Sequence, residues 1–202
     1  MIEDLELTTE SAMLRSWASA ELSHPERWKG LTSLVHPTPL RRFQRGELLH
    51  EYDLQALEAA IRMFRAPLLR SLLPIAREWY TCALPMRELE NLKVTVGFPP
   101  FAQAAPSGLF GELASVPTTE RPIPADAISR LRSGFDLTAM KGCPIVVAES
   151  TQGPYLLVEG YTRCCVALLK HREGEFDEGR MPLFLGIVSG LAEWEWAKAP
   201  TT

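Results

Sequence analysis

The chain has 202 residues, of which 46% are hydrophobic and 23% charged, and its formal net charge is −4. This composition is ordinary for a folded protein and disfavours intrinsic disorder, and the length allows one large domain or two small ones. An acidic chain needs a local basic patch to bind nucleic acid. No apolar run reaches the roughly 18 residues of a membrane span, and the acidic start lacks a basic signal region. We therefore expect a cytoplasmic protein with no membrane partner.

The first half of the chain is expected to be helical. Thr8 or Thr9 can cap a helix over residues 10–22, and a connection rich in Pro, Ser, Thr and Gly follows. Apolar residues recur every three to five positions over residues 47–64, which predicts a helix with one buried face. Prolines interrupt residues 68–84, so one or two shorter, kinked helices are expected there.

The middle of the chain has a different character. Residues 92–96 alternate and include β-branched side chains, which predicts a strand. Residues 97–124 carry six prolines and three glycines, which predicts a wrapping loop or linker. A short helix is expected over residues 125–132. We therefore divide the chain into a helical region, 1–90, and a second domain, 91–202, which can share one core because no flexible linker separates them.

The last third has the clearest pattern. Two short apolar segments, residues 144–148 and 155–159, flank a turn rich in polar residues and glycine, and they predict a β-hairpin. Gly160 then opens a helix over residues 161–171. The apolar run 181–188 has the length of a further strand.

One motif in this region points to chemistry: Gly160-Tyr161-Thr162-Arg163. Glycine allows a positive φ at a sharp strand-to-helix turn and lets a ligand approach the backbone. The first turn of a helix leaves N–H groups with a partial positive charge, and the Arg163 guanidinium suits phosphate. Thr162 can donate its hydroxyl to a phosphate oxygen or help hold a metal. Glu159 can help hold a cation or act as a base.

The order strand, turn, strand, Gly-x-x-Arg, helix, strand resembles the ParB/sulfiredoxin superfamily. The resemblance rests on Pro144-Ile145-Val146-Val147 and on Tyr155-Leu156-Leu157-Val158-Glu159-Gly160-Tyr161-Thr162-Arg163, and it extends over about residues 125–196. It implies an α/β (α+β) fold, with the helical N-terminal half packed on a ParB/sulfiredoxin-like domain that has a small mixed sheet. It also implies nucleotide-phosphate binding, with ATP and Mg²⁺ as cofactors. The implied binding residues are Gly160, Tyr161, Thr162 and Arg163, and the implied catalytic residues are Glu159 and Arg163.

The same residues also allow a purely structural interpretation. Gly160 can serve the turn alone, and Thr162 can act only as a helix N-cap. Arg163 can pair with Glu159 or with a loop carboxylate. Taken alone, a four-residue Gly-x-x-Arg motif is weak evidence, and only the surrounding strands and helix favour phosphate binding. For Glu159, a structural ion pair is favoured over catalysis.

The chain departs from two branches of the superfamily. Sulfiredoxins carry a cysteine two positions before the motif arginine, where this chain has Tyr161, so reduction of sulfinic acids is disfavoured. ParB partition proteins continue into a helix-turn-helix and a dimerisation domain, for which residues 164–202 are too short. The resemblance thus implies a stand-alone core, similar in size and layout to plasmid fertility-inhibition proteins of the Osa type.

The remaining cysteines and histidines predict no metal site. None of the four cysteines, Cys82, Cys143, Cys164 and Cys165, forms a C-x-x-C pair, and the histidines show no zinc spacing. Reduced and mostly buried thiols are therefore expected.

Two functional hypotheses follow. In the first, the chain is an enzyme that binds ATP or a related nucleotide and hydrolyses a phosphate ester, as an ATPase or a DNase in plasmid or DNA-transfer biology. In the second, it is a catalytically inactive ParB-like module whose helical half binds a protein partner. An open polar pocket lined by Glu159 and further carboxylates favours the enzyme, whereas a pocket filled by Tyr161 or Phe135 favours the module.

DNA is a further possible partner. Arg41, Arg42 and Arg45 cluster before a helix and can contact nucleic-acid phosphates. A solvated or internally paired face is the favoured interpretation of this cluster.

Overall fold

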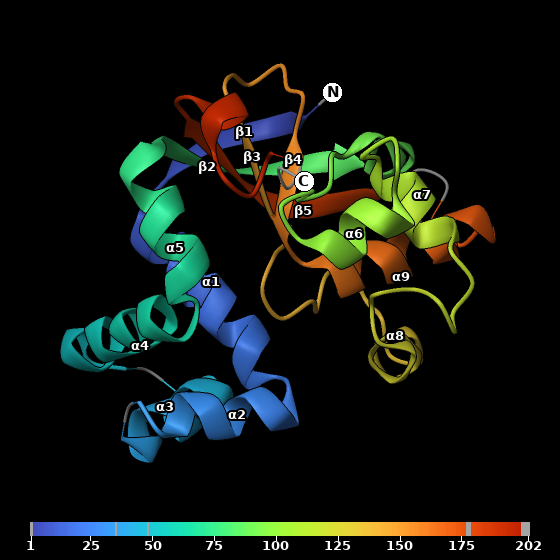
Figure 1. Cartoon of the computed structure of the whole chain (residues 1–202). Coiled ribbons are helices and arrows are strands. Elements are labelled where there is room, and N and C mark those ends of the chain that lie inside the picture. The colour runs from blue at the N-terminus through green and yellow to red at the C-terminus, as the bar shows by residue number, and fades with distance from the viewer. Residues whose placement is uncertain (1, 35, 48, 177–178, 199–202) are drawn as a thin grey trace.

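The computed structural model describes residues 2–34, 36–47, 49–176 and 179–198. Within them, a five-stranded mixed sheet has helices on both faces (Figure 1). Its strands are β1 (Glu3–Thr8), β2 (Ala76–Pro85), β3 (Ile145–Ala148), β4 (Leu156–Glu159) and β5 (Arg180–Val188), in the order β1-β2-β5-β3-β4. Only β3 and β5 pair in parallel. The expected α+β class is therefore confirmed.

The helices fall into three groups along the chain. The first group is α1 (Glu10–Leu22), α2 (Pro25–Thr32), α3 (Pro37–Gln44), α4 (Glu51–Phe64), α5 (Ala66–Leu72) and the 3-10 turn η1 (Leu73–Ile75). Between β2 and β3 lie η2 (Met86–Asn91), α6 (Pro99–Ala104), α7 (Phe110–Ser115) and α8 (Ala125–Arg132). Helix α9 (Tyr161–Arg172) connects β4 to β5, and the turn η3 (Leu191–Glu193) follows β5.

Helix α1 forms over the predicted residues, for the predicted reason. Thr9 has an extended backbone at the N-cap, and its Oγ1 accepts a hydrogen bond from the Ala12 N–H at 3.1 Å. Its buried residues include Leu14 and Trp17. The predictions for α8 and for the two hairpin strands are confirmed as well.

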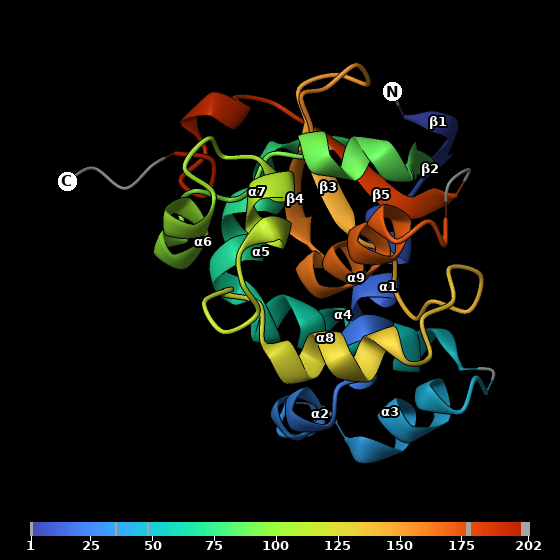
Figure 2. The same ribbon diagram turned by 90° about the vertical axis from the view of Figure 1, so that its right-hand side faces the viewer.

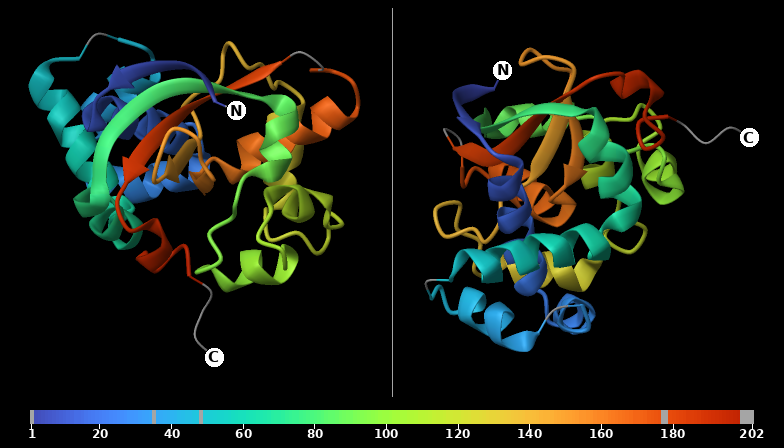
Figure 3. Two further views of the ribbon diagram at one scale, coloured as in Figure 1. Left: turned by 90° about the horizontal axis from the view of Figure 1, so that it is seen from above. Right: turned by 90° about the vertical axis from the view of Figure 1, so that its left-hand side faces the viewer.

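The sheet is apolar on both faces, which explains the unbroken hydrophobic runs of its inner strands. In β3, Val146 and Ala148 face a core shared with α7 and α9, whereas Ile145 and Val147 face a core shared with α1 and α5. Figure 3 shows these two groups of helices on opposite sides of the curved strands. A third, smaller core joins α1 to α2, α3 and α4, around Leu40 and Leu57.

Several predicted elements were wrong. The short helices expected over residues 68–84 end at Ile75, with α5 and η1, and the rest of this range forms strand β2. Residues 92–96 contribute only isolated bridges at Lys93, because the chain turns away before it can pair along a strand. The proline-rich residues 97–124 contain α6 and α7, each entered through a local turn, and are therefore not a plain loop.

The expected boundary after residue 90 falls inside η2, one residue before its end. Strands β1 and β2 precede that boundary, yet β2 pairs along its length with β5, which follows it. Gly186 of β5 leaves room for the Trp79 ring on β2, since a Cβ there would lie 2.8 Å from the indole. The helical half thus adds two strands to the sheet. No helix among the described residues is long and apolar enough to cross a membrane.

Candidate functional site

A cavity of about 940 Å³ lies beside the junction of β4 and α9. Its lining includes residues of α1, α2, the α4–α5 junction, α8, the segment 95–101 and the C-terminal Trp196. Figure 2 shows α8 and α2 one above the other, with α9 close by. Segments that are far apart in the sequence therefore line the same cavity, and the sequence motif supplies only one side of it.

Gly160 makes the turn from β4 into α9. Its φ is 97°, in the left-handed region that favours glycine. A Cβ at this position would lie 2.6 Å from Pro144 Cβ and 2.8 Å from Pro144 Cα. The fold therefore requires glycine here whether or not a ligand binds. Within the described chain, no side chain caps the first turn of α9, so its N–H groups stay available to an anion.

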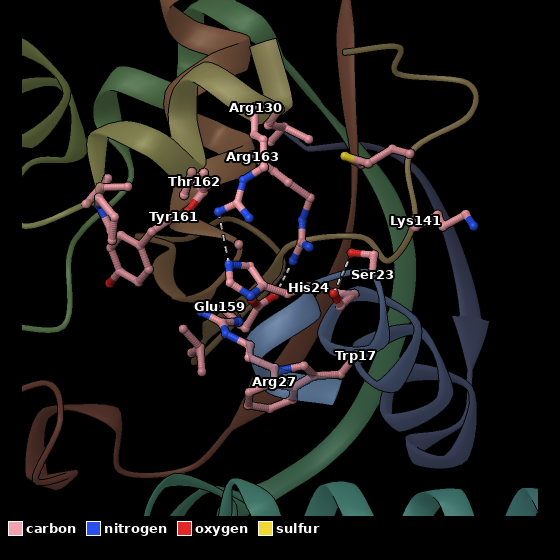
Figure 4. Close-up of a pocket in the computed structure, with 18 of the residues that line it drawn as sticks. Trp17, Ser23, His24, Arg27, Arg130, Lys141, Glu159, Tyr161, Thr162 and Arg163 are labelled. Atoms are coloured by element: carbon pink, nitrogen blue, oxygen red, sulfur yellow. Dashed lines mark hydrogen bonds and ion pairs between the residues drawn. The ribbon is translucent and has the colours of Figure 1, made fainter. Parts of the chain in front are cut away.

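The Tyr161 side chain is used by the fold. Its hydroxyl donates to the Leu157 carbonyl at 2.7 Å and accepts from the Thr95 N–H at 2.9 Å. The ring lies 4.2 Å from that of Phe101, and burial raises the pKa of the phenol far above its usual value. In Figure 4 the hydroxyl points away from Arg163. Of the predicted contacts from Tyr161, only the backbone N–H is left for a phosphate.

 
At the centre of the motif, Arg163 Nη2 and Glu159 Oε2 form an ion pair. The two side chains are only 12% and 14% exposed. The Arg163 Nε is buried and has no hydrogen-bond partner within the described residues. The structural ion pair considered from the sequence thus exists, and it leaves the buried Nε donor unused. Thr162, one residue before Arg163, lies on the same helical turn and lines the cavity half-buried.

The opposite wall carries a buried carboxylate between two arginines. The Glu21 side chain is fully buried, accepts from Arg27 Nη1 at 2.7 Å and Arg65 Nε at 2.8 Å, and also accepts from the Trp17 indole N–H at 3.0 Å. Burial alone would raise the pKa of Glu21, but the charges of Arg65 and Arg27 outweigh it and leave that pKa below its ordinary value. Two cations share one anion, so this wall keeps a net positive charge.

Arg130 joins the two walls. Its Nη2 lies 3.0 Å from Asp126 Oδ2 and 3.4 Å from His24 Nε2. Figure 4 shows Arg130 reaching toward His24 while Arg163 reaches toward Glu159, with both guanidinium groups on the same side of the cavity. Lys141 also lines the cavity but points away from this group in the same view.

Three buried side-chain polar atoms have no hydrogen-bond partner within the described part of the chain. They are His24 Nδ1, Arg163 Nε and Trp196 Nε1, and all three residues line the cavity. A buried polar atom without a partner costs free energy, so such atoms mark a place where a missing group would be accommodated. Sequence reasoning found Arg163 through its motif. It missed His24 and Trp196, which carry no local signal.

The aromatic and carboxylate side chains expected to distinguish an enzyme from a binding module line the cavity. Tyr161 and Phe135 both line the cavity and leave it open, and the Phe135 ring packs at 6.1 Å from that of Phe176. Two carboxylates besides Glu159 line the cavity. Asp126 pairs with Arg130, and Asp136 accepts two hydrogen bonds from Thr138, which lower the Asp136 pKa.

The implied Mg²⁺ has no protein cage among the residues that the structure describes. They contain no group of three His, Cys, Asp or Glu side chains that could hold a metal ion. Because Glu159 and Asp126 are each engaged by an arginine, the donor set does not fit a directly bound cation.

Two of the cysteines and two arginines of the basic cluster pack or pair within the fold. Cys164 and Cys165 are buried in the core under the sheet, and burial raises the pKa of both thiols. Arg42 lies 3.4 Å from Glu47 and from Asp53, and Arg45 lies 2.7 Å from Glu47. The favoured interpretation of internal pairing therefore describes these two arginines.

Comparisons with known proteins add no relative. No model of a protein family matches the chain, and neither the curated proteins nor the solved structures contain a significant match.

Proposed function

We propose that the chain binds the phosphates of a nucleotide, with ATP as the reference ligand, at the start of α9. The observation that carries this proposal is the buried Arg163 Nε without a partner, at the edge of an open cavity of about 940 Å³. A phosphate oxygen placed there would receive this N–H and the uncapped N–H groups of the first turn of α9. Arginine and a helix N-terminus are both suited to a phosphate dianion.

The order of the elements supports the same proposal. Strand β3 begins after Pro144, pairs with β4, and β4 runs through Gly160 into α9, after which β5 returns parallel to β3. This is the arrangement expected of a stand-alone ParB/sulfiredoxin-like domain. Membership of that superfamily, and a role in plasmid or DNA-transfer biology, are part of the proposal.

Calorimetric titration with ATP in the presence of Mg²⁺ tests the proposal. We expect wild type to bind and Arg163→Ala to lose about 1.5–3 kcal/mol, the scale of a hydrogen bond to a charged group. Arg132→Ala is the matched control, since Arg132 is also paired with a glutamate but does not line the cavity. Equal binding by Arg163→Ala and wild type, or no binding by a folded wild type, would refute the phosphate site.

Hydrolysis of ATP or of DNA is the catalytic form of the proposal. A phosphate at Arg163 would compete with Glu159 for the guanidinium and leave the carboxylate beside the bound phosphate. Phosphate release or DNA cleavage by wild type, lost in Glu159→Gln with binding retained, would support a catalytic base.

The second candidate is a catalytically inactive protein-interaction module whose helical half binds a protein partner. The Glu159–Arg163 ion pair favours it, because the two charges already neutralise each other in the absence of a ligand. Folded wild type that binds no ATP, releases no phosphate and cleaves no DNA would favour this candidate.

A further inference from the structure

Trp196 has a buried hydrogen-bond donor and lines the cavity away from the motif. Its indole Nε1 is buried and has no partner among the described residues, although the residue itself is only partly buried. The neighbouring Trp194 shows the usual arrangement, since its Nε1 donates to Ser71 Oγ at 2.9 Å. A buried indole N–H normally finds an acceptor. The Trp196 donor therefore points to an acceptor that a ligand would bring.

The segment 95–98 connects Trp196 to the α9 turn. The Thr95 N–H donates to the Tyr161 hydroxyl at 2.9 Å, and the Gly97 N–H donates to the Trp196 carbonyl at 3.1 Å. A Cβ on Gly97 would lie 2.8 Å from Trp196 Cα, so the two backbones are in close contact. Figures 1 and 2 show the chain after η3 passing beside α6. Trp196 is thus held against the same segment that anchors Tyr161.

Aromatic rings line this side of the cavity. Phe98 is 39% exposed, and its ring meets that of Phe101 edge to face at 4.8 Å. Phe101 in turn packs against Tyr161. Phe98, Phe101 and Trp196 all line the cavity, so apolar faces and one N–H donor lie together at one side. A flat heteroaromatic ring with an acceptor on its edge satisfies both features at once.

The cavity is much larger than a phosphate needs. A volume of about 940 Å³ lies at the upper end of the range for sites that hold whole small molecules. Phosphate at Arg163 would leave the aromatic side empty. We infer that Trp196, Phe98 and Phe101 form a nucleobase subsite, in which the Trp196 indole N–H donates to a ring acceptor of a nucleoside polyphosphate. This inference rests on the proposed function and adds a second recognised group, the nucleobase, to the phosphate.

Calorimetric titrations with ATP and with inorganic tripolyphosphate separate the two parts of the site. Trp196→Phe keeps one aromatic ring and removes the N–H together with the five-membered ring of the indole. We expect it to weaken ATP binding about tenfold, the scale of one lost hydrogen bond to a buried donor, and to leave tripolyphosphate binding unchanged. Without ligand, we expect the unfolding temperature to fall less than in Trp194→Phe, because both variants lose the same ring volume but only Trp194→Phe loses a satisfied hydrogen bond. Trp194→Phe is the matched control, which loses a satisfied hydrogen bond outside the cavity and keeps the wild-type ratio of the two affinities.

The outcomes distinguish this inference from the function on which it rests. If wild type binds tripolyphosphate as tightly as ATP, or if Trp196→Phe weakens both ligands equally or neither, the nucleobase subsite is wrong while the phosphate site stands. If folded wild type binds neither ligand, the proposed function itself is wrong and the subsite is lost with it.

Discussion

At the scale of single residues, Glu21 is the most consequential charge in the structure. It is fully buried in α1, and donors from three residues, Trp17, Arg27 and Arg65, surround it. Removing one partner of a buried ion pair costs more than the pair itself contributes, because the remaining charge loses its compensation. Glu21 therefore holds the helical wall of the cavity in place and also fixes both arginines that line it.

Replacement of Glu21 by Gln should destabilise the protein by about 2–3 kcal/mol, below the range for a fully buried pair because both arginines are partly exposed. Urea unfolding at pH 7 measures this loss. Glu51→Gln is the control: Glu51 pairs with Arg15 at an exposed site, so its loss should cost less than about 1 kcal/mol. Equal effects of the two substitutions would contradict the structural role given to Glu21.

The same residue predicts a pH dependence. The folded-state pKa of Glu21 is lowered, so its contribution to stability is fully present above the unfolded value of about 4.3 and is lost as the pH falls through the folded pKa. Unfolding free energies of wild type and Glu21→Gln, measured from pH 7 to pH 3, should therefore converge at the acid end. A constant difference across this range would show that Glu21 acts through packing alone.

Gly160 allows a second test at this scale. Gly160→Ala would combine a positive φ with a contact of 2.6 Å to Pro144, and we expect a loss of about 3 kcal/mol or more in unfolding free energy. Gly46 has a similar φ of 71° but nothing within 4 Å, so Gly46→Ala should cost only about 1–2 kcal/mol. A smaller effect at Gly160 than at Gly46 would show that the turn can relax away from Pro144.

At the scale of elements, the sequence predicts what is encoded locally. Helix α1 follows from its cap at Thr9, and α9 follows from Gly160. Strand β2 was missed because the helical pattern before it was extended through Pro74. Its signal was present: Trp79, Tyr80 and Thr81 favour strands, and Cys82, Leu84 and Met86 are buried at alternate positions.

Strand β1 was missed for a different reason. It lies at the edge of the sheet, and Leu5 and Leu7, its two leucines, are 40% and 74% exposed. Acidic residues surround them, as is typical of edge strands, so no buried face marks the segment as a strand. Pairing with β2 forms it, and that partner lies about seventy residues away in the sequence.

At the scale of the whole molecule, the cavity could not be predicted from the sequence. Arg163 and Glu159 belong to a motif, and their ion pair joins the last residue of β4 to the first turn of α9. His24, Arg27 and Trp196 reach the same space only because α2 and the segment after η3 fold against it. Such contacts between distant segments have no local pattern, so sequence reasoning found one side of the site and missed the rest.

The sheet predicts how the chain depends on its two halves. Residues 91–202 alone would lack β2, leaving one edge of β5 unpaired and Ile145, Val147 and Phe184 without the helices that cover them. We expect this fragment to lack a cooperative unfolding transition and a dispersed amide NMR spectrum, and we expect co-expression with residues 1–90 to restore both. A well-dispersed spectrum of the fragment alone would establish residues 91–202 as an independent domain.

The cavity is lined by separate parts of the chain, and this affects how a preference for one ligand can evolve. The α9 turn is fixed by Pro144 behind it, so a substitution at Gly160 carries a penalty to the whole fold. The aromatic side is built from the start of the short helix α6 and from the segment after η3, and such connecting segments tolerate change more readily. Divergent copies of such a protein can keep the turn at Gly160 and change the aromatic residues that line the other side of the cavity. Proteins that share the turn need not share a ligand, and variation around Phe98 and Trp196 would record that divergence.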